Sequence, residues 1–563
     1  MSRTRRTGNF SLGLDFGTES VRAVLVGTST GEMAGESVQS YRSGVMDESL
    51  PGRSRVRLPP DWALQDPRDY LQSLKEAVRR VLRTSGVKPG GVIGIGIDFT
   101  SCTMLPALGD GTPLASLRAF RDEPHAWVKL WKHHAAQPQA DRATRIALER
   151  REPFLSRYGG RISSEWMFPK ILEILEKAPK VAGNAERFLE AQDWVAWQLT
   201  GSERRSSCAA GYKAFWSKRA GLPPADYFKA LHPDLPEIVS RKMGKTVLPP
   251  GQKAGGLVPE WAGVLGLPPG TPVGVPIIDA HAAVLGSGVS GENEMVLCMG
   301  TSTCHLLLDR KEKPVRGMTG VVEDGIIPGS FGYEAGQAAV GDLFAWLVRS
   351  ILAKPDGPRE EAGIFSRLES RAARLRPGES GLLALDWWNG NRSILMDAGL
   401  SGLIVGLTLN TKPHEIYRAL MEATAMGTRR IIQEFESQGL PVLKLHAAGG
   451  LAEKNPLLLQ VYSDVTGREI RVPRSRQVCA LGAAILGSVA AGSPRGHGSV
   501  HEAVRAMTSP GRISVKPDPG RGAVYEKLYG SYCRLHDAFA PGGDTVMKDL
   551  REIRSRILAD PKA

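Results

Sequence analysis

A pattern of an apolar run, a tight turn and a second apolar run occurs twice in this chain. Residues 12–26 carry the first copy and residues 295–308 the second, and both turns begin with Gly-Thr. Two short β-type runs around a turn predict a β-hairpin. A hairpin repeated near the start of each half indicates an internal duplication, with a domain boundary near residues 285–294. An ungapped alignment of the copies places Leu297 on Leu14, Gly300 on Gly17, Thr301 on Thr18, Thr303 on Ser20 and Leu308 on Leu25.

Length and composition agree with two globular domains. A chain of 563 residues is too long for one hydrophobic core, so two large domains are expected. Hydrophobic residues make up 42% and charged residues 23%, which is ordinary for a globular protein. The net charge is +13, from 72 Lys and Arg against 59 Asp and Glu, which suits an anionic partner. Because the basic residues are scattered, a small anionic substrate is favoured over nucleic acid.

Other features of the composition indicate a cytoplasmic protein. No apolar run approaches the length of a transmembrane helix, and none of signal-peptide length follows the basic residues 1–8, so no membrane contact is expected. None of the six cysteines forms a CxxC pair. That pattern indicates reduced thiols of the cytosol and argues against a disulfide framework or a zinc site.

The turn of the first hairpin carries groups that suit phosphate and a metal ion. Backbone N–H groups and hydroxyls at residues 17–20 can surround phosphate oxygens. Asp15, at the end of the first apolar run, can hold Mg²⁺ directly or through water. The second copy has Cys298 at the matching position, so only the first keeps a carboxylate. A plain hairpin with polar turn residues is the alternative for this segment alone.

Two further segments end in polar residues where strands are expected to stop. Residues 91–99 form a dense apolar run typical of a buried parallel strand, followed by Ser101 in a polar turn. The carboxyl ends of such strands face the ligand crevice in α/β folds. Asp279 stands where a second strand passes into a helix. There it is either a helix cap, which stabilises by about 1 kcal/mol, or a catalytic base.

The remaining chain gives a coarse order of helices, strands and loops. Apolar spacing predicts helices from residue 67 to about residue 83 and over residues 413–436. Residues 444–450 are expected to form a strand that ends in two glycines. A small-residue helix is expected over residues 479–492, packed closely against another element. Other segments are a helix over 188–200, a polar loop over 204–215 that carries Lys213, and a peripheral helical tail beyond residue 505.

Taken in order, these motifs resemble the actin/hexokinase ATPase superfamily and, more closely, the FGGY carbohydrate kinases. The resemblance covers nearly the whole chain. It implies an α/β fold of two duplicated actin/hexokinase-like (ribonuclease H-like) ATPase domains with a central cleft, over residues 9–286 and 292–545. The motifs are Asp15 to Ser20, Gln65-Asp66-Pro67, Asp279 in IIDAHAAVLG, Gly300-Thr301-Ser302, Gly449-Gly450 with Asn455, and Ala480 to Ala484.

The resemblance also implies a role for each site residue, with ATP and Mg²⁺ as cofactors. Asp279 is expected to be the catalytic base and Asp15 to organise Mg²⁺. Ser101, Lys213 and Glu334, together with Asp279, are expected to bind the sugar. Nucleotide binding is expected at Gly17, Thr18, Glu19, Ser20, Arg22, Gly300, Thr301, Ser302, Gly341, Gly449, Gly450 and Asn455.

Within that family the segments GIDFTSCTMLP and YEAGQ are similar to those of the ribulose kinases. The resemblance implies phosphorylation of the terminal hydroxyl of L-ribulose and allows a homodimer. A kinase for another ketose or polyol, such as D-ribulose or xylulose, is an alternative. A non-catalytic, actin-like ATP switch is a second alternative, and a nucleic-acid binder is the weakest because it depends on net charge alone.

Overall fold

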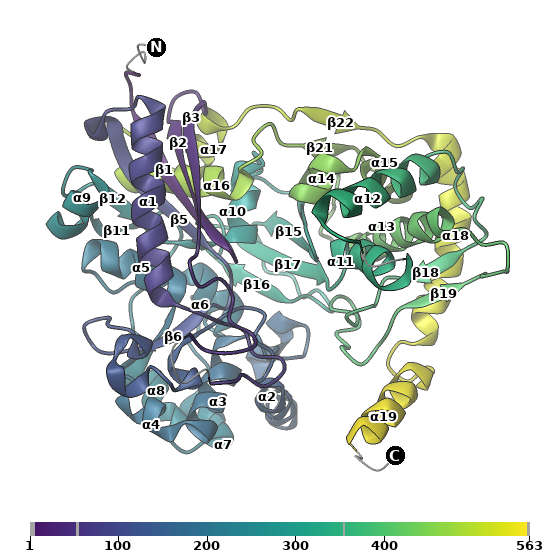
Figure 1. Cartoon of the computed structure of the whole chain (residues 1–563), viewed down its shortest axis with the longest axis horizontal. Helices are drawn as coiled ribbons and strands as arrows, with labels where there is room; N and C mark the ends of the chain where they lie inside the picture. Colours follow the sequence, from purple (N-terminus) through teal and green to yellow (C-terminus); the bar gives the residue numbers. More distant parts are fainter. Residues whose placement is uncertain (1–5, 52–55, 353–354, 560–563) are drawn as a thin grey trace.

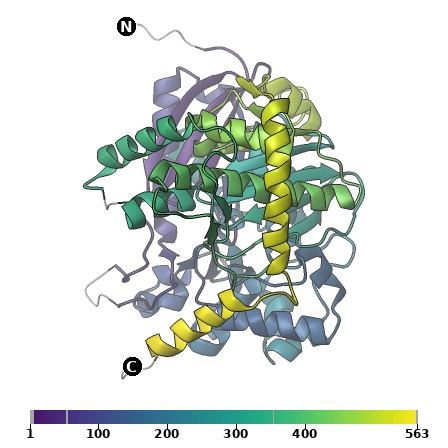
Figure 2. The same cartoon turned by 90° about the vertical axis from the view of Figure 1, so that its right-hand side faces the viewer.

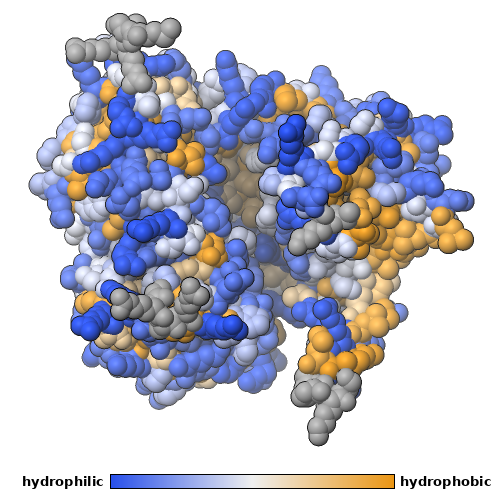
Figure 3. All heavy atoms as spheres, in the orientation of Figure 1, coloured by the Kyte–Doolittle hydropathy of each residue, from blue (hydrophilic) through white to orange (hydrophobic). Residues whose placement is uncertain are grey.

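The protein is described here by a computed structural model of residues 6–51, 56–352 and 355–559. Figure 1 shows two α/β bodies side by side, and within the described residues each is built around a seven-stranded sheet. The space-filling view in Figure 3 shows a hollow between the two bodies. No helix in these ranges is long and apolar enough to cross a membrane. All six cysteines are free, as expected for reduced thiols.

The N-terminal sheet is centred on two buried parallel strands. Every residue of β1 (Phe10–Phe16) and β5 (Val92–Phe99) is buried, as expected for strands covered on both faces. On the other side, β1 forms the predicted antiparallel hairpin with β2 (Ser20–Gly27). On one side the sheet ends at β3 (Met33–Ser40), which pairs with β2. On the other side β12 (Pro272–Gly274) and β13 (Ile277–Ile278) pair with β5, and β11 (Lys253–Gly256) pairs with β12.

The C-terminal sheet repeats this arrangement. Strand β14 (Glu294–Met299) pairs antiparallel with β15 (Thr303–Asp309) and parallel with β20 (Lys444–Ala448), just as β1 pairs with β2 and β5. The shared order confirms the predicted duplication. The other strands of this sheet are β16 (Gly320–Glu323), β17 (Phe331–Gln337), β21 (Ile470–Val472) and β22 (Ile513–Val515).

The ungapped alignment of the two hairpins is wrong after the turn. In the first hairpin the Gly17 N–H donates to Ser20 O, whereas in the second the Gly300 N–H donates to Ser302 O. The second turn is therefore one residue shorter, and Ser302, not Thr303, occupies the place of Ser20. Asp15 still corresponds to Cys298, because Asp15 pairs with Arg22 across its hairpin and Cys298 with Cys304 across the other.

Helix α16 (Val478–Ala491) belongs to the far end of the sequence but packs on the N-terminal sheet. It lies against β1, β5 and α10 (Asp279–Gly286). The approach is so close that a Cβ at Gly96 would overlap the carbonyl oxygen of Ala483. This confirms the predicted close packing of the small-residue helix. It also means that the N-terminal body contains a segment beyond residue 286.

The longer predicted helices are present with small shifts of their ends. Helix α1 (Pro67–Ser85) begins after Asp66, whose side chain accepts from the Arg68 N–H, and it ends at the left-handed Gly86. Helix α13 (Pro413–Ser437) extends the prediction by one residue. The expectation of a peripheral tail is wrong for α18 (Pro519–Ala538), because it buries Tyr525, Tyr529 and Tyr532 against the C-terminal core.

Two predicted segments differ from the structure. The expected loop over residues 204–215 is short β9 (Arg205–Ser206) followed by helix α6 (Ser207–Lys213), which Ser206 caps through the Cys208 N–H. Lys213 therefore stands at the end of a buried helix and not on a loop. The expected helix over 188–200 begins as strand β8 (Arg187–Glu190) and becomes α5 (Ala191–Thr200), closed by Gly201 as predicted.

The other elements complete the two bodies. In the N-terminal body they are β4 (Leu64–Gln65), β6 (Met104–Ala107), β7 (Val128–Lys129), β10 (Val247–Leu248), α2 (Gln137–Glu149), α3 (Met167–Lys177), α4 (Pro179–Asn184), α7 (Ala225–Leu231), α8 (Leu235–Lys242) and α9 (Pro259–Leu265). The C-terminal body adds β18 (Leu383–Leu385), β19 (Leu403–Val405), α11 (Gly341–Trp346), α12 (Pro358–Ala372), α14 (Gly450–Lys454), α15 (Pro456–Thr466) and α19 (Val546–Ala559). Helix α17 (Val500–Met507) packs on α16 and lies beside β3 in Figure 1, so it belongs with the N-terminal body.

Candidate active site

Three aspartates meet at the carboxyl edge of the N-terminal sheet. Asp15 and Asp98 are direct partners in the parallel register of β1 and β5. Ile277 of β13 is the partner of Asp98 on the other side, so Asp279 follows at the same edge. The topology thus brings together residues that are up to 264 positions apart in the sequence (279 minus 15).

Asp279 is the first residue of α10, and the N-cap position before it is held by Ile278, which makes no side-chain cap. The Asp279 Oδ1 accepts a hydrogen bond from the Ala280 N–H at 2.7 Å. Burial and the neighbouring Asp15 carboxylate raise the pKa of Asp279 to about 7. A carboxylate with a pKa close to neutral pH is well matched to accept a proton in catalysis. Of the two interpretations drawn from the sequence, the helix cap is wrong, because Ile278 and not Asp279 stands at the N-cap position. The base stays a prediction, and one of the two carboxylate oxygens remains available for it.

Asp98 is a site residue that was not singled out from the sequence. It is fully buried, and burial together with Asp15 raises its pKa well above the ordinary value. Asp15 itself accepts a hydrogen bond from Arg22 Nη1 at 3.0 Å. The signal available in the sequence was an aspartate near the end of each of two apolar runs, at Asp15 and Asp98. Only the parallel pairing of those runs shows that the carboxyl groups are neighbours.

The aspartate edge suits a cation that is held mainly by other ligands. Within the described ranges no group of three or more His, Cys, Asp and Glu side chains is close enough to hold a metal ion alone. Mg²⁺ commonly takes only one or two carboxylates and completes its shell with water and substrate phosphates. Asp15, which is 6% exposed and lies in β1 just before the turn of the first hairpin, fits that kind of site.

The turn of the first hairpin is held from behind by protein contacts. Trp131 Nε1 donates to Thr18 Oγ1 at 3.1 Å, and Gln65 Nε2 donates to Thr18 O at 2.6 Å. Gly17, Thr18 and Ser20 are half-buried, and Glu19 is exposed. The turn is thus fixed in place while part of its surface remains open to a ligand.

The second hairpin lies beside two other predicted nucleotide segments. The Gly341 N–H donates to Gly300 O at 3.1 Å, and a Cβ at Gly341 would come within 2.6 Å of that oxygen. Gly449 has a φ of +100° and lies so close to Met299 that a side chain there would overlap its carbonyl. Gly300, Thr301, Gly449 and Gly450 are exposed and Ser302 is half-buried, which leaves an open surface at this edge.

Asn455 has a structural role in the protein. Its Oδ1 accepts from the Leu458 N–H at 2.8 Å, which caps α15, and its Nδ2 donates to the Tyr417 hydroxyl at 3.4 Å. The residue is 6% exposed. Its side chain is therefore committed to holding the segment after Gly450 and is not presented to the surface.

Lys213 and Glu334 form an ion pair between the two halves of the chain. Lys213 Nζ donates to both carboxylate oxygens of Glu334, at 2.9 and 3.1 Å, and His281 Nε2 lies 3.3 Å from Glu334 Oε2. Burial acts to raise the pKa of Glu334, but the attraction of Lys213 and His281 outweighs it and lowers the pKa. Burial acts likewise to lower the pKa of Lys213, and the Glu334 carboxylate raises it. Both groups are therefore charged at neutral pH.

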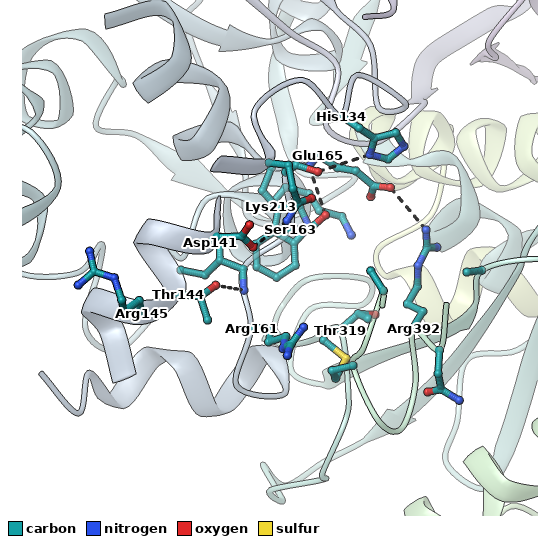
Figure 4. Close-up of a pocket in the computed structure, with 18 of the residues that line it drawn as sticks. His134, Asp141, Thr144, Arg145, Arg161, Ser163, Glu165, Lys213, Thr319 and Arg392 are labelled. Atoms are coloured by element: carbon teal, nitrogen blue, oxygen red, sulfur yellow. Dashed lines mark hydrogen bonds and ion pairs between the residues drawn. The ribbon is translucent and has the colours of Figure 1, made fainter. Parts of the chain in front are cut away.

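A cavity of about 570 Å³ opens beside this pair (Figure 4). Lys213 and Glu334 line it, together with Thr319, while Ser101 and Asp279 are not among its lining residues. Glu165 from the N-terminal body and Arg392 from the C-terminal body meet across it, with 3.5 Å between the carboxylate and the guanidinium. No sequence pattern predicts this second pair, because its members are distant in the chain and stand in no motif.

Two comparisons with curated relatives cover almost the whole chain. It is 52% identical to a ribulokinase of Halalkalibacterium halodurans over 98% of each chain. It is 44% identical to a ribulokinase of Mycolicibacterium smegmatis, covering 97% of this chain and 96% of the relative.

Solved structures and family models agree on the fold. A xylulose kinase from Rhodospirillum rubrum aligns with a TM-score of 0.75 at 21% identity, over 94% of this chain and 98% of the other. Residues 10–286 match the N-terminal domain of the FGGY family of carbohydrate kinases, and residues 295–491 match its C-terminal domain. The α/β fold of two duplicated actin/hexokinase-like domains, expected from the sequence, is thereby confirmed. The chain belongs to the FGGY family of carbohydrate kinases.

Proposed function

We propose that this protein is an ATP-dependent kinase that phosphorylates the terminal hydroxyl of L-ribulose to give L-ribulose 5-phosphate. The observation that carries the proposal is Asp279, a carboxylate with a pKa of about 7 beside the first phosphate hairpin. Relatives 44% and 52% identical over nearly their full length are ribulokinases, which supports L-ribulose as the acceptor.

In the proposed reaction Asp279 accepts the proton of the sugar hydroxyl. The hydroxyl oxygen forms a bond to the γ-phosphorus of ATP while the bond from that phosphorus to the β–γ bridging oxygen breaks. ADP leaves with the electron pair of the broken bond, and the proton remains on Asp279 until it is lost to solvent. Phosphoryl transfer of this kind depends chiefly on positioning and on neutralising charge.

The two hairpins would hold the nucleotide phosphates from opposite sides. The turn at Gly17 to Ser20 belongs to the N-terminal sheet and the turn at Gly300 to Ser302 to the C-terminal sheet. Gly341, Gly449 and Gly450 would let the nucleotide approach the backbone, and Asn455 would fix the segment behind them. Mg²⁺ would be held near Asp15 and would neutralise phosphate charge during transfer.

The sugar is proposed to lie between Ser101 and the Lys213–Glu334 pair. Lys213 supplies ammonium donors for a ketone or hydroxyl oxygen, and Glu334 supplies an acceptor for sugar hydroxyls. Because these two groups come from different halves, a bound sugar would contact both bodies. That arrangement supports closure around the substrate, which excludes water and limits ATP hydrolysis.

A panel of sugars in a coupled assay of ADP release tests the proposal. L-ribulose is expected to give the highest kcat/KM, with D-ribulose, D-xylulose and L-xylulose lower. A clear preference for another ketose would overturn the assignment of the acceptor and leave the kinase activity standing. The absence of any sugar-stimulated ATP turnover would favour the alternative of a non-catalytic ATP switch.

We also propose that the protein acts in the cytoplasm as a homodimer that pairs through α19. In Figure 1 this helix projects from the C-terminal body, and among its described side chains only Met547 is buried. Figure 2 shows the same helix at the C-terminal end of the chain. Val546, Leu550, Ile553 and Ile557 form an exposed stripe with the 4-3-4 spacing of a coiled-coil seam. Isolated helices of about 14 residues are marginal in water, so a stripe of this kind favours a partner.

The charges beside the stripe favour a second copy as that partner. In an antiparallel pair of α19 helices about a two-fold axis, Asp549 of each copy would face Arg556 of the other. Such a contact is self-complementary, as an interface between identical subunits requires. Free thiols at all six cysteines support the cytoplasmic location. The scattered positive charge is assigned to binding nucleotide and sugar phosphate, with neither nucleic acid nor membrane as a partner.

A further inference from the structure

Lys170 of α3 is a fully buried lysine without an acidic partner. No carboxylate oxygen lies within 4.0 Å of its ammonium group in the part of the chain that the structure describes. The group donates instead to two backbone carbonyls, Cys102 O at 2.6 Å and Leu130 O at 2.8 Å. Removing an ammonium from water is costly, and a buried one is normally paired with an acid. The reason why a buried ammonium binds two backbone carbonyls is therefore sought in the segments to which these carbonyls belong.

The first carbonyl belongs to the turn that follows β5. Cys102 has a φ of +54°, the left-handed conformation that non-glycine residues rarely adopt. It directly follows Ser101, the residue of this turn proposed to face the sugar. The turn has internal hydrogen bonds as well, between the Thr100 and Thr103 hydroxyls at 3.0 Å and from Thr103 Oγ1 to Ser101 O at 3.3 Å. Lys170 thus binds the backbone of Cys102, the residue of this turn with the left-handed conformation.

The second carbonyl belongs to the segment that supports the first phosphate hairpin. Leu130 directly precedes Trp131, whose indole Nε1 donates to Thr18 Oγ1 at 3.1 Å. Leu130 O also accepts from the His133 N–H at 3.0 Å, so this short segment is fixed at both ends. One ammonium group thus connects the turn at Ser101 with the segment that contacts Thr18.

We infer that Lys170 is a positioning residue that fixes the sugar-side turn relative to the phosphate hairpin. It touches neither substrate directly. By holding both segments it would set the distance between the hydroxyl that attacks and the phosphate that is transferred. The inference depends on the proposed function, because it requires the sugar at Ser101 and the phosphates at Thr18.

Lys129 provides a matched control within the same body. It is also fully buried, but its ammonium donates to Glu173 at 2.9 Å and lies 4.3 Å from the ring of Trp62. Its ammonium has no hydrogen bond to the Ser101 turn or to Leu130. Lys129→Met also removes a buried ammonium and leaves the buried Glu173 carboxylate without this partner, so its loss of stability should be at least as large as that of Lys170→Met. A loss of substrate positioning should appear only in Lys170→Met.

The experiment measures KM for L-ribulose, KM for ATP and kcat for Lys170→Met and Lys129→Met, each at a temperature where it is fully folded. For Lys170→Met we expect kcat/KM for L-ribulose to fall about 100-fold, since displacements near 1 Å cost that much. The control should change it less than about 3-fold. Equal effects of the two variants, or an unchanged kcat/KM in Lys170→Met, would overturn the inference.

A second comparison shows whether Lys170 acts through the Ser101 turn. The effects of Ser101→Ala and Lys170→Met should be clearly less than additive in the double variant, because both act on one turn. Additive effects would count against the inference. If Lys170→Met does not fold, Lys170→Gln, which keeps one donor group, takes its place in both measurements. A wild-type enzyme without sugar-dependent turnover would refute the proposed function instead, so the two failures can be told apart.

Discussion

At the scale of single residues, Asp279 is held in place and keeps an oxygen for a further partner. Its Oδ1 accepts from the Ala280 N–H at the start of α10. In the proposed reaction the other oxygen accepts the proton of the sugar hydroxyl. Burial in the cleft and the nearby Asp15 charge give this carboxylate the proton affinity that a base requires.

Replacing Asp279 by Asn should remove the base and keep the bond from the Ala280 N–H, because the Asn side chain still has an amide oxygen that accepts. We expect kcat to fall by about 10²- to 10⁴-fold. ATP affinity, measured by calorimetry, should stay close to that of the wild type. Near-normal turnover of Asp279→Asn would show that another group accepts the proton.

The pH dependence of kcat/KM should reflect the protonation of the Asp279 carboxylate. Because the pKa of Asp279 is raised to about 7, the free enzyme carries the active, deprotonated base only above that value. The kcat/KM for sugar should therefore rise with pH through about 7 and level off above it. Steady-state rates between pH 5.5 and 9 test this, and a profile that is flat across neutral pH would contradict it.

The Lys213–Glu334 pair should matter for stability as well as for sugar binding. Removing one partner, as in Lys213→Met, leaves a buried charge and should cost about 3 to 5 kcal/mol of unfolding free energy. The double variant Lys213→Met, Glu334→Gln should recover much of that stability but not the activity. Urea unfolding followed by fluorescence measures both, and a double variant no more stable than the single one would argue against a coupled pair.

The same pair has a defined pH window. The pKa of Glu334 is lowered in the folded protein, so its stabilisation is present above the ordinary glutamate pKa and is lost as pH falls through the folded value. The pKa of Lys213 is raised in the folded protein. The stabilisation that Lys213 contributes is therefore present below the ordinary lysine pKa and is lost as pH rises toward the raised pKa of the folded state. The pair therefore stabilises the protein across the neutral range.

At the scale of elements, the close packing of α16 on β1 and β5 explains several glycines in the two strands. Gly96→Ala would place a methyl group onto the Ala483 carbonyl, and the helix would have to move. We expect a loss of about 1 to 3 kcal/mol or more, as for other overpacked cores. In α9 the same change at Gly263, where no atom lies within 4 Å, should be neutral or slightly stabilising. Chemical denaturation compares the two, and equal effects would contradict the packing argument.

The helices and strands also show which elements can be predicted from local sequence patterns and which cannot. Apolar spacing located α1 and α13 to within a few residues. Helix α1 buries one face, whereas α13 is buried on all sides over residues 417–428 and is amphipathic only beyond them. Apolar spacing failed for α6, a helix of seven residues that is too short for a periodic signal. It failed as well for the second hairpin, where a turn shortened by one residue is invisible in an ungapped alignment.

At the scale of the whole molecule, the sequence was enough for the duplicated fold and placed Lys213 and Glu334 among the residues of the cavity. It did not reveal which residues from different halves touch. The pairs Lys213 with Glu334 and Glu165 with Arg392 depend on how the two bodies meet, and no local pattern records that arrangement. The same holds for Asp98, whose neighbour Asp15 is set by strand order alone.

The proposed dimer is tested at this scale. Leu550→Glu places a charge on the exposed stripe of α19 and should convert the protein to a monomer in sedimentation experiments. Leu443→Glu is a matched control, since Leu443 is 65% exposed and Leu550 63%. Asp549→Arg should weaken the dimer, and Asp549→Arg with Arg556→Asp should restore it. A wild-type monomer, or a dimer unaffected by Leu550→Glu, would contradict the proposal.

The position of α16 has a consequence for how the chain is made. The N-terminal sheet lacks the helix that covers β1 and β5 until residues 478–491 have left the ribosome. The 191 residues between α10 and α16 (residues 287–477) take about 10 to 40 s to synthesise at ordinary rates of translation. During that interval a large apolar surface stays open to chaperones and to aggregation. A gene cut after residue 290 should accordingly yield an insoluble N-terminal product, and co-expression of residues 291–563 should rescue its solubility.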